Sequence, residues 1–360
     1  MVWAAIIAAT CLLLLVFQKM LWLVVPFLLA LILYYFLYPL VKLLIFRGMS
    51  RDAAATLVTL GFLALLSVVG VALAPRVVAQ MADWEETVSR YLQGGLHLLD
   101  SSLRSIEAHW PTLASAHLAD TVAARLAQGA GSIADHLEPV AIGIMAWAPS
   151  LMLAPFLAFF FLRDGRRFAR FLSSAVPNAF FEKTLYLLHE IDLTARAYFL
   201  GLISLTVLDT LTLAAGLWAL GIPGPFALGL ICAVLAWVPY VGSILGGLLV
   251  VLVAATDFPG TPGMAYWAIA LFIVVRLLDD FVYMPLTIGK SLELHPLVTV
   301  LMIFIGGAVA GVSGLMLVLP VLGVVMVIGE TIGVIVTDPR LMARHRHAMA
   351  LQRAQASSDL

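Results

Sequence analysis

The chain has 360 residues, of which 63% are hydrophobic and only 11% are charged, and its formal net charge is −1. A soluble domain does not need so much apolar surface, and a charge near zero gives no electrostatic basis for binding nucleic acid. Several apolar runs reach the roughly 20 residues that cross a bilayer as a helix. None alternates in the roughly 10-residue segments of a transmembrane barrel. The sequence therefore predicts an all-α, polytopic helical membrane protein with about eight apolar segments.

Residues 1–74 are predicted to form the N-terminal membrane helices. The expected helices cover residues 2–19, 21–45 and 53–74. Because the start of the chain lacks the positive charge of a secretory signal, the first helix is expected to remain uncleaved. The two cysteines, Cys11 and Cys232, lie in apolar runs and are expected to be core residues rather than a disulfide.

Residues 75–140 differ in character and predict an extracytoplasmic region of amphipathic helices. Apolar residues recur there at helical spacing, and charged residues occupy the other face. The apolar positions of the first stretch are Trp84, Val88, Tyr91, Leu92, Leu96, Leu99, Leu103 and Ile106. A second stretch runs from Leu118 to Leu137. Such apolar faces are expected to be buried against each other, against the membrane surface or against a neighbouring subunit.

The remaining chain divides into four predicted segments. They are a membrane helix over 141–162, a cytoplasmic helical segment over 163–196, a C-terminal membrane core over 197–338 and a basic tail over 339–360. The bias of lysine and arginine in loops predicts their orientation. Three such residues lie in 42–51, six in 163–196 and four in the tail, whereas 75–140 has four basic and eight acidic residues. Both termini are therefore expected in the cytoplasm, with 75–140 outside.

Two long apolar segments, 226–255 and 297–336, are interrupted near their middles. The helix-breaking residues are Pro239 and Gly242 in the first segment and Gly307, Gly311 and Gly314 in the second. As a single helix the shorter segment would already be about 45 Å long. The segments either cross the membrane once each or form re-entrant hairpins that enter from opposite faces. Small residues at these breaks allow backbones to approach closely.

Asp209 is the only acid in its predicted membrane helix. Ser204, Thr206, Thr210 and Thr212 lie near it. An acid in hydrocarbon costs about 2.5–3.5 kcal/mol on insertion scales, so its presence indicates a functional or a structural role. It is expected either to bind a coupling ion or solute, or to pair with a polar group on another helix for structure alone.

Arg276 precedes Asp279 and Asp280 by three and four residues, so the three side chains share one helix face. In one interpretation the charge pair opens when a substrate or proton binds. In the other it is an internal salt bridge that lowers the cost of insertion. Two acids with one arginine leave a net negative charge, which favours a proton on one acid.

The sequence contains none of the motifs of metalloproteases, α/β-hydrolases or P-loop ATPases. The chain is therefore expected not to be an enzyme and to need no metal. No cofactor is expected beyond a coupling proton or sodium ion.

Several motifs together resemble the autoinducer-2 exporter (AI-2E) family of bacterial membrane permeases. They are Phe160–Gly165, Val238–Gly242, the block Asp279–Pro296, and Gly311–Gly314 followed by Pro320. The layout is also similar, with three spans, an extramembrane helical region and a longer membrane half. The matching positions are Pro239, Gly242, Asp279, Pro285, Gly289, His295, Pro296, Gly311 and Gly314. Asp280 departs from the pattern, because an asparagine often follows the acid in relatives.

The resemblance implies a bacterial inner-membrane protein, often a homo-oligomer, that exports a small polar solute such as a quorum-sensing signal. Other relatives are described as sodium– or lithium–proton antiporters. We predict an ion-coupled secondary transporter whose pathway contains Asp209, Arg276, Asp279 and Asp280. The alternatives are a monovalent cation–proton antiporter, and a channel or membrane scaffold without coupled transport. The expected partners are a small polar solute or monovalent cation, membrane lipid and further copies of the chain.

Overall fold

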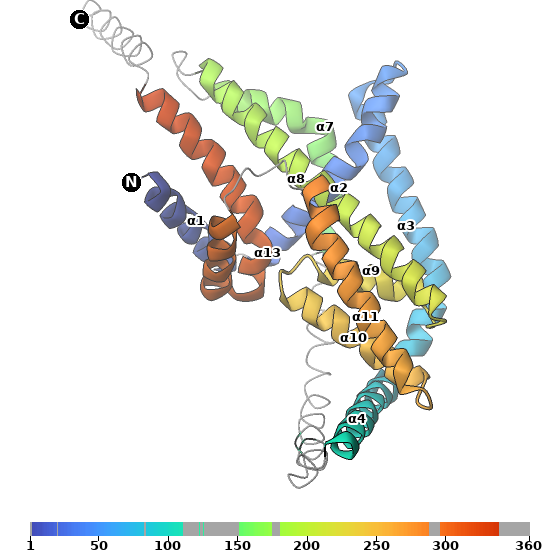
Figure 1. The fold of residues 1–360 in the computed structure, drawn as a ribbon. Coiled ribbons are helices and arrows are strands. Elements are labelled where there is room, and N and C mark those ends of the chain that lie inside the picture. The colour runs from blue at the N-terminus through green and yellow to red at the C-terminus, as the bar shows by residue number, and fades with distance from the viewer. Residues whose placement is uncertain are drawn as a thin grey trace, which may run out of the picture. The chain divides into compact units, whose positions relative to one another are not determined.

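The computed structural model describes residues 2–19, 21–82, 84–110, 122, 125, 151–174, 181–287 and 296–337. The regular elements in these residues are all helices, which confirms the predicted fold class (Figure 1). The helices are α1 (Val2–Lys19), α2 (Leu21–Phe46), α3 (Arg51–Ala82), α4 (Trp84–His109), α7 (Leu153–Ser174), α8 (Phe181–Ala219), α9 (Pro225–Leu235), α10 (Val241–Asp257), α11 (Pro262–Leu278), α12 (Met284–Thr287) and α13 (Pro296–Thr337).

Three helical stretches among the described residues are long and apolar enough to cross a membrane. They are Val25–Phe46, Arg51–Ala72 and Thr184–Ala219. The first two helices match their predicted boundaries closely, but the third, predicted to end at residue 74, continues past Pro75 to Ala82. The boundary predicted between the segments 163–196 and 197–338 falls inside one continuous helix, α8, which begins at Phe181. No proline or glycine lies between residues 181 and 200 to end a helix there.

Residues 111–121 and 126–150 lie outside the described part of the chain. Most of the second predicted amphipathic stretch and the first ten residues of the helix predicted over 141–162 fall there. Gly289, His295 and the tail over 339–360 also lie outside it. The predicted orientation of the chain and its division into membrane and cytoplasmic segments stay predictions.

The chain forms two compact units. The first contains Met1–Thr59, Met152–Gly201 and Ile288–Leu360, and the second contains Leu60–Leu151 and Leu202–Thr287. In the first unit α1 packs on α13, and α2 packs on α7. The α1–α13 core is made of large aliphatic side chains, including Leu14, Met302 and Leu322. The α2–α7 contact is made instead by small residues, Ala30 against Ala154 and Ala158, which lets these two helices approach closely.

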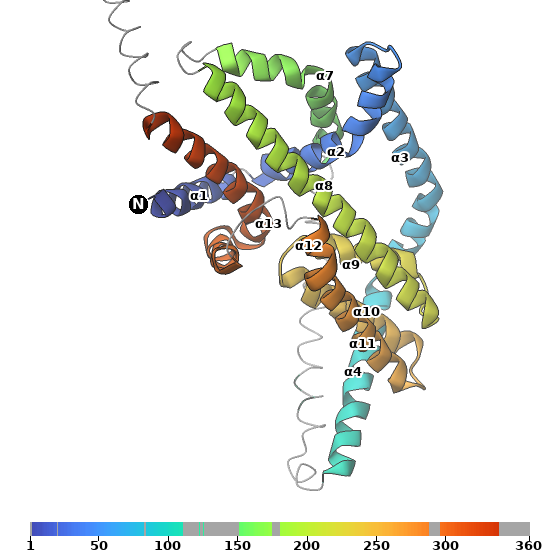
Figure 2. The same ribbon diagram turned by 45° about the horizontal axis from the view of Figure 1, so that its top comes forward.

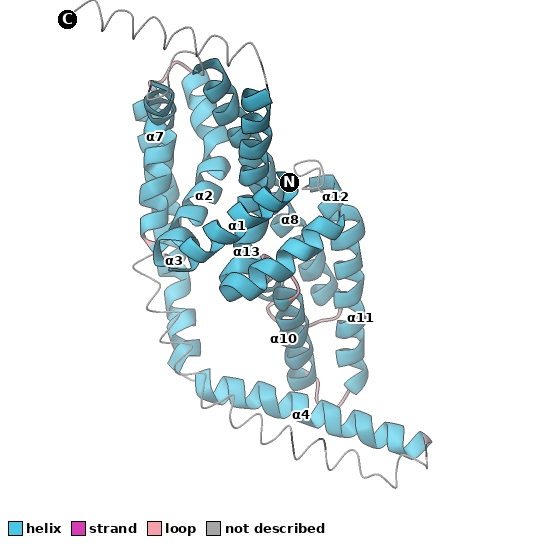
Figure 3. Cartoon of the chain, turned by 90° about the vertical axis from the view of Figure 1, so that its left-hand side faces the viewer, coloured by secondary structure: helices cyan, strands magenta, loops and turns pink. Residues whose placement is uncertain are grey.

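In the second unit, α10 packs against α4, α9 and α11. Its core includes Leu217 of α8, Val250 and Ala254 of α10 and Ala268 of α11, all of which are almost fully buried. Figure 3 shows α4 crossing the ends of α10 and α11.

The packed face of the amphipathic helix α4 overlaps the predicted one only in part. Its packed positions are Tyr91, which was predicted, and Gly94, Gly95 and Leu98, which were not. Gly94 allows a close approach, because a Cβ atom there would overlap the backbone of Thr256 in α10. Leu99 and Ile106, which the apolar pattern places on the packed face, are 43% and 48% exposed. Glycine carries no hydropathy signal, so the periodicity of large apolar residues missed the glycine part of the contact. The cover for this helix is thus partly α10 of the same chain.

The first interrupted segment is a helical hairpin formed by α9 and α10. The break covers residues 236–240, where Tyr240 has a φ of 63°. The two arms contact each other, and the Cys232 thiol donates a weak hydrogen bond to the Gly246 carbonyl at 3.5 Å. A Cβ atom at Gly242 would overlap the Leu235 carbonyl oxygen, so only glycine fits where the arms meet.

The second interrupted segment, α13, also folds back on itself. Its helical geometry stops at Ala310 and Gly311, and Gly311 has a φ of +59°. Gly306 and Gly314 would be about 12 Å apart in a continuous helix. Instead their backbones are in contact, and a Cβ on either would overlap the other residue. The two predicted hairpins are therefore present, with the second turn one helical turn after Gly307. Whether they re-enter the membrane stays a prediction.

Candidate functional site

Asp209 lies in the second half of α8 and points into the second unit. Its side chain is only 7% exposed, and its Oδ1 atom has no hydrogen-bond partner among the described residues. The neighbouring hydroxyls do not reach it, because Thr206 and Thr210 donate to the carbonyls of Leu202 and Thr206, each four residues back in the helix. The Asp209 carboxylate therefore has a buried hydrogen-bond acceptor, Oδ1, that no described residue uses.

Asp279 and Asp280 follow α11 in a π-helical turn, Asp279–Tyr283. Arg276 holds both acids, with Nη1 at 2.5 Å from Asp279 Oδ2 and Nη2 at 2.9 Å from Asp280 Oδ1. The two acids differ in burial, because the Asp279 side chain is 5% exposed and the Asp280 side chain 47%. Asp279 Oδ1, like Asp209 Oδ1, is buried without a hydrogen-bond partner among the described residues. Turns of the π type occur often at functional sites, because the extra residue re-aims the side chains that follow.

A cavity of about 30 Å³ brings these groups together. It is lined by Asp209, Leu213, Cys232, Ala233, Ala236, Ser243, Phe272, Val275, Arg276 and Asp279. Three of the four predicted pathway residues line it, and the fourth, Asp280, does not. The volume is enough for one or two water molecules or a small cation. The walls are otherwise mostly apolar, so electrostatic interactions inside the cavity are weakly screened.

The α9–α10 break forms one side of this cavity. Ala236 is the first residue after α9, and Ser243 lies in the first turn of α10. Tyr240 adopts a conformation that costs a non-glycine residue roughly 1–3 kcal/mol, a strain that clusters at functional sites. Pro239 and Gly242 thus shape the site without lining it.

Two hydrogen bonds between elements hold the site together, and the sequence did not predict them. Trp237 Nε1, in the break, donates to Thr206 Oγ1 at 2.8 Å. Tyr283 Oη, at the end of the π-helical turn, lies 2.8 Å from Thr212 Oγ1. Each bond joins α8 to one of the irregular elements. The threonines near Asp209 were noticed in the sequence, but their partners lie 31 and 71 residues away.

The remaining predicted positions lie elsewhere. Pro285 is exposed in α12, and Pro296 is the first residue of α13. Gly307, Gly311 and Gly314 belong to the α13 fold-back, which is part of the first unit, so the cavity in the second unit is built without them.

Unpaired buried carboxylate oxygens determine what the site can do. An unsatisfied buried polar group costs about 1–3 kcal/mol, and more if it is charged. Two carboxylates, Asp209 and Asp279, line the cavity with one arginine, Arg276, which leaves an excess of negative charge. The arrangement therefore favours a proton or a cation, and it disfavours an anion.

The helices, the interrupted segments and the buried charges define a polytopic helical membrane protein with buried acidic side chains around a small cavity in its second unit. A family model described as AI-2E family transporter matches residues 4–333, and the chain belongs to this family. It is accordingly a membrane transporter, and the resemblance found in the motifs is confirmed.

Similar proteins come from distant bacteria. The chain is 27% identical to YueF of Bacillus subtilis (strain 168), a candidate transport protein, over 83% of this chain and 81% of the relative. It is 29% identical to MT0215 of Mycobacterium tuberculosis (strain CDC 1551 / Oshkosh), also a candidate transport protein, over 88% and 84%. PerM of Escherichia coli (strain K12), a candidate permease, is 22% identical over 83% and 84%.

Proposed function

We propose that the protein is an ion-coupled secondary transporter that exports a small polar solute, and that Asp209 and Asp279 bind the coupling proton or sodium ion. The observation that supports this is the pair of buried carboxylates on the wall of one small cavity, each with an oxygen that has no hydrogen-bond partner among the described residues. A structural salt bridge needs only the Arg276–Asp279 contact. It does not explain a second buried acid with no cation of its own.

The two acids have different tasks in this proposal. Arg276 compensates the charge of Asp279 through Oδ2 and leaves Oδ1 available. Asp209 makes no ion pair with any other described residue, so a proton or cation is what neutralises it. Loading of Asp209 removes its repulsion from Asp279 and makes the site as a whole nearly neutral. During a conformational change of the transporter, a neutral site costs less free energy in surroundings of low dielectric constant than a charged site does.

The cavity size favours the ion rather than the solute at this position. A space of about 30 Å³ is too small for a polar organic molecule, whose pockets are about ten times larger. The solute therefore needs a conformation in which the α9–α10 break has opened. The Trp237–Thr206 and Tyr283–Thr212 hydrogen bonds are the polar contacts that such an opening breaks.

The same observation supports a second candidate, a monovalent cation–proton antiporter, because the cavity accepts a bare cation as it stands. Proteoliposomes loaded with a pH-sensitive dye distinguish the two. A sodium pulse that moves protons without added solute supports the antiporter. Proton movement that requires a solute gradient supports the exporter. Ohmic single-channel currents in a planar bilayer would contradict both and indicate a channel.

The test of the site is the variant pair Asp209→Asn and Asp279→Asn, with Asp280→Asn as the matched control. Asp280 contacts the same arginine but lies outside the cavity. We expect both cavity variants to assemble normally and to lose coupled proton flux by at least about 100-fold, whereas the control keeps most of it. Unchanged flux in either cavity variant removes that residue from the mechanism.

We further propose a bacterial inner-membrane location with both termini in the cytoplasm and a homo-oligomeric assembly. The distribution of basic residues supports the orientation. Single cysteines placed in the tail and in α4, on a background without Cys11 and Cys232, test it by labelling with an impermeant maleimide. Labelling of the tail cysteine from outside intact cells would contradict the orientation.

A further inference from the structure

The second half of α7 combines arginines with exposed aromatic rings. Its arginines are Arg163, Arg166, Arg167 and Arg170. Phe168 and Phe171, which lie on a neighbouring face of the helix, are 61% and 68% exposed. The first half of the helix is different, because Ala154 and Ala158 are buried against α2 and Phe161 packs edge-on to Phe27. One helix thus has a packed apolar half and an uncovered amphipathic half.

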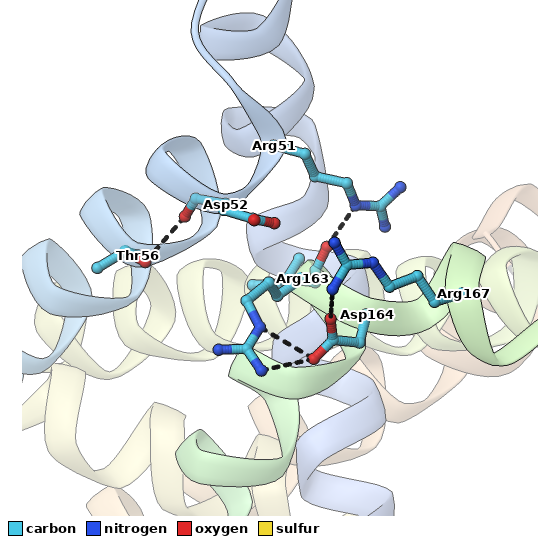
Figure 4. A network of polar contacts seen from close by, with 7 residues as sticks. Arg51, Asp52, Thr56, Arg163, Asp164 and Arg167 are labelled. Atoms are coloured by element: carbon cyan, nitrogen blue, oxygen red, sulfur yellow. Dashed lines mark hydrogen bonds and ion pairs between the residues drawn. The ribbon is translucent and has the colours of Figure 1, made fainter.

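A bend separates the two halves, as Figure 2 shows. At the bend, Arg51 Nε donates to the Leu162 carbonyl at 2.8 Å (Figure 4). A side chain that bonds to a helix carbonyl is a known cause of bending. Next to it, Asp164 Oδ2 accepts two hydrogen bonds from Arg163, and Asp164 Oδ1 lies 3.5 Å from Arg167 Nη1. These contacts fix the direction in which the amphipathic half leaves the bundle.

The charges around the bend do not cancel. The group, called here the arginine cluster, contains Arg51, Asp52, Arg163, Asp164 and Arg167 (Figure 4) together with Arg166, which follows Arg163 by three residues on the same side of the helix. Four arginines and two aspartates leave a net charge of +2. The hydrogen bond from Arg163 holds the pKa of Asp164 below its ordinary value, so this acid is ionised at neutral pH, and the excess remains positive. Arg167 is 70% exposed even though it pairs with Asp164.

We propose that the second half of α7 lies on the membrane surface and that the arginine cluster binds the phosphate groups of anionic phospholipids. Guanidinium groups bind phosphate oxygens in pairs, and the rings of Phe168 and Phe171 fit the boundary between headgroups and acyl chains. Clusters of basic residues next to a membrane helix are typical of this recognition. The neighbouring helix α2 contains one of the candidate spans, Val25–Phe46, so the lipid surface lies within reach of the cluster without any partner protein.

The end of α2 has the same chemistry. Phe46 is 79% exposed, and the Lys42 ammonium group lies 5.5 Å from the centre of its ring. A basic group beside an exposed ring at the end of an apolar helix is the usual arrangement at a membrane interface. Both α2 and α7 therefore carry basic side chains together with exposed phenylalanine rings.

Native mass spectrometry of the full chain in detergent tests the proposal, with phosphatidylglycerol and phosphatidylcholine as the probes. The variant is Arg166→Gln with Arg167→Gln. The matched control, Arg90→Gln with Arg104→Gln, removes the same charge from α4. We expect wild-type protein and control to bind phosphatidylglycerol more tightly than phosphatidylcholine. The α7 variant should lose about five-fold in phosphatidylglycerol affinity per arginine, or about 25-fold in all.

Two further variants keep the test decisive if the glutamine pair fails to assemble. Arg166→Lys with Arg167→Lys keeps the charge and should keep most of the preference for phosphatidylglycerol. Phe168→Ser with Phe171→Ser should weaken binding of both lipids to a similar degree, because it removes only the apolar part. Equal binding of the two lipids by the wild-type protein overturns the proposal. The proposal is also overturned if the lysine pair loses the preference for phosphatidylglycerol or if the glutamine pair keeps it. An equally large loss of phosphatidylglycerol affinity in the α4 control would overturn it as well.

Discussion

Two arginine–aspartate pairs of this transporter, one at the α7 bend and one in the cavity of the second unit, differ in what surrounds them. At the α7 bend, Arg163 and Asp164 meet at the surface, with further arginines around them. In the cavity of the second unit, Arg276 and Asp279 meet beside a second buried acid, Asp209, among apolar walls. The contact distances are similar. Burial and carboxylate oxygens without a described partner, rather than the pairing itself, therefore distinguish the proposed ion site from the pair at the bend.

The largest expected effect is on coupled proton flux, which should be lost in a cavity variant and kept in a variant at the α7 bend. Asp209→Asn should abolish coupled flux, because an amide does not take up a proton at neutral pH and has no negative charge to balance a cation. Asp164→Asn should leave flux within about three-fold of wild type, since exposed ion pairs contribute little. Proton flux in proteoliposomes measures both. Comparable losses in the two variants would mean that burial does not define the site.

The next effect concerns stability. Arg276→Gln leaves the buried Asp279 without its cation, and we expect the free energy of unfolding to fall by about 3 kcal/mol. This value is at the lower limit for buried ion pairs because the Arg276 side chain is one third exposed. A thermal shift assay in detergent should show a clear fall in the apparent melting temperature. Adding Asp279→Asn should restore most of it. If the double variant is as unstable as the single one, packing by Arg276 rather than its charge is what matters.

The hairpin at the cavity gives a smaller effect. Gly242→Ala places a methyl group against the Leu235 carbonyl oxygen and forces the two arms apart. We expect a loss of about 1–3 kcal/mol, together with reduced flux. Gly263→Ala, on α11, is the control, because nothing lies near a Cβ atom at that position. Equal stability of the two variants would mean that the break adapts easily.

Tyr283→Phe removes one hydrogen bond between the π-helical turn and α8. The expected loss of stability is about 0.5–1.5 kcal/mol. If this bond holds the cavity closed, the turnover rate should change more than the melting temperature does. A variant with reduced stability and an unchanged turnover rate would limit Tyr283 to a structural role.

The smallest effect is the pH dependence of the surface pair. Since the pKa of Asp164 is lower in the folded protein than its ordinary value, the pair stabilises the fold above that ordinary value. The contribution is lost as the pH falls through the lowered pKa. Melting temperatures of the wild type and Asp164→Asn should therefore converge in acid. A difference that widens in acid would contradict the assignment.

The sequence by itself determined the class of the protein, the helices and the positions of the two breaks. Hydrocarbon requires long apolar helices, and glycine and proline disrupt them wherever they occur, so these features are written locally in the chain. It also marked Asp209 and Asp279, because charge in an apolar run is visible without any structure.

Only the tertiary structure decided which acids share a cavity. Asp279 and Asp280 are neighbours with one arginine, and the π-helical turn buries the first and leaves the second outside. Likewise, the partners of Thr206 and Thr212 are fixed by how α8 packs on the break and the turn. Glycine contacts such as Gly94 and Gly95 against α10 leave no hydropathy signal at all. Burial and pairing between distant segments depend on packing, which no local pattern encodes.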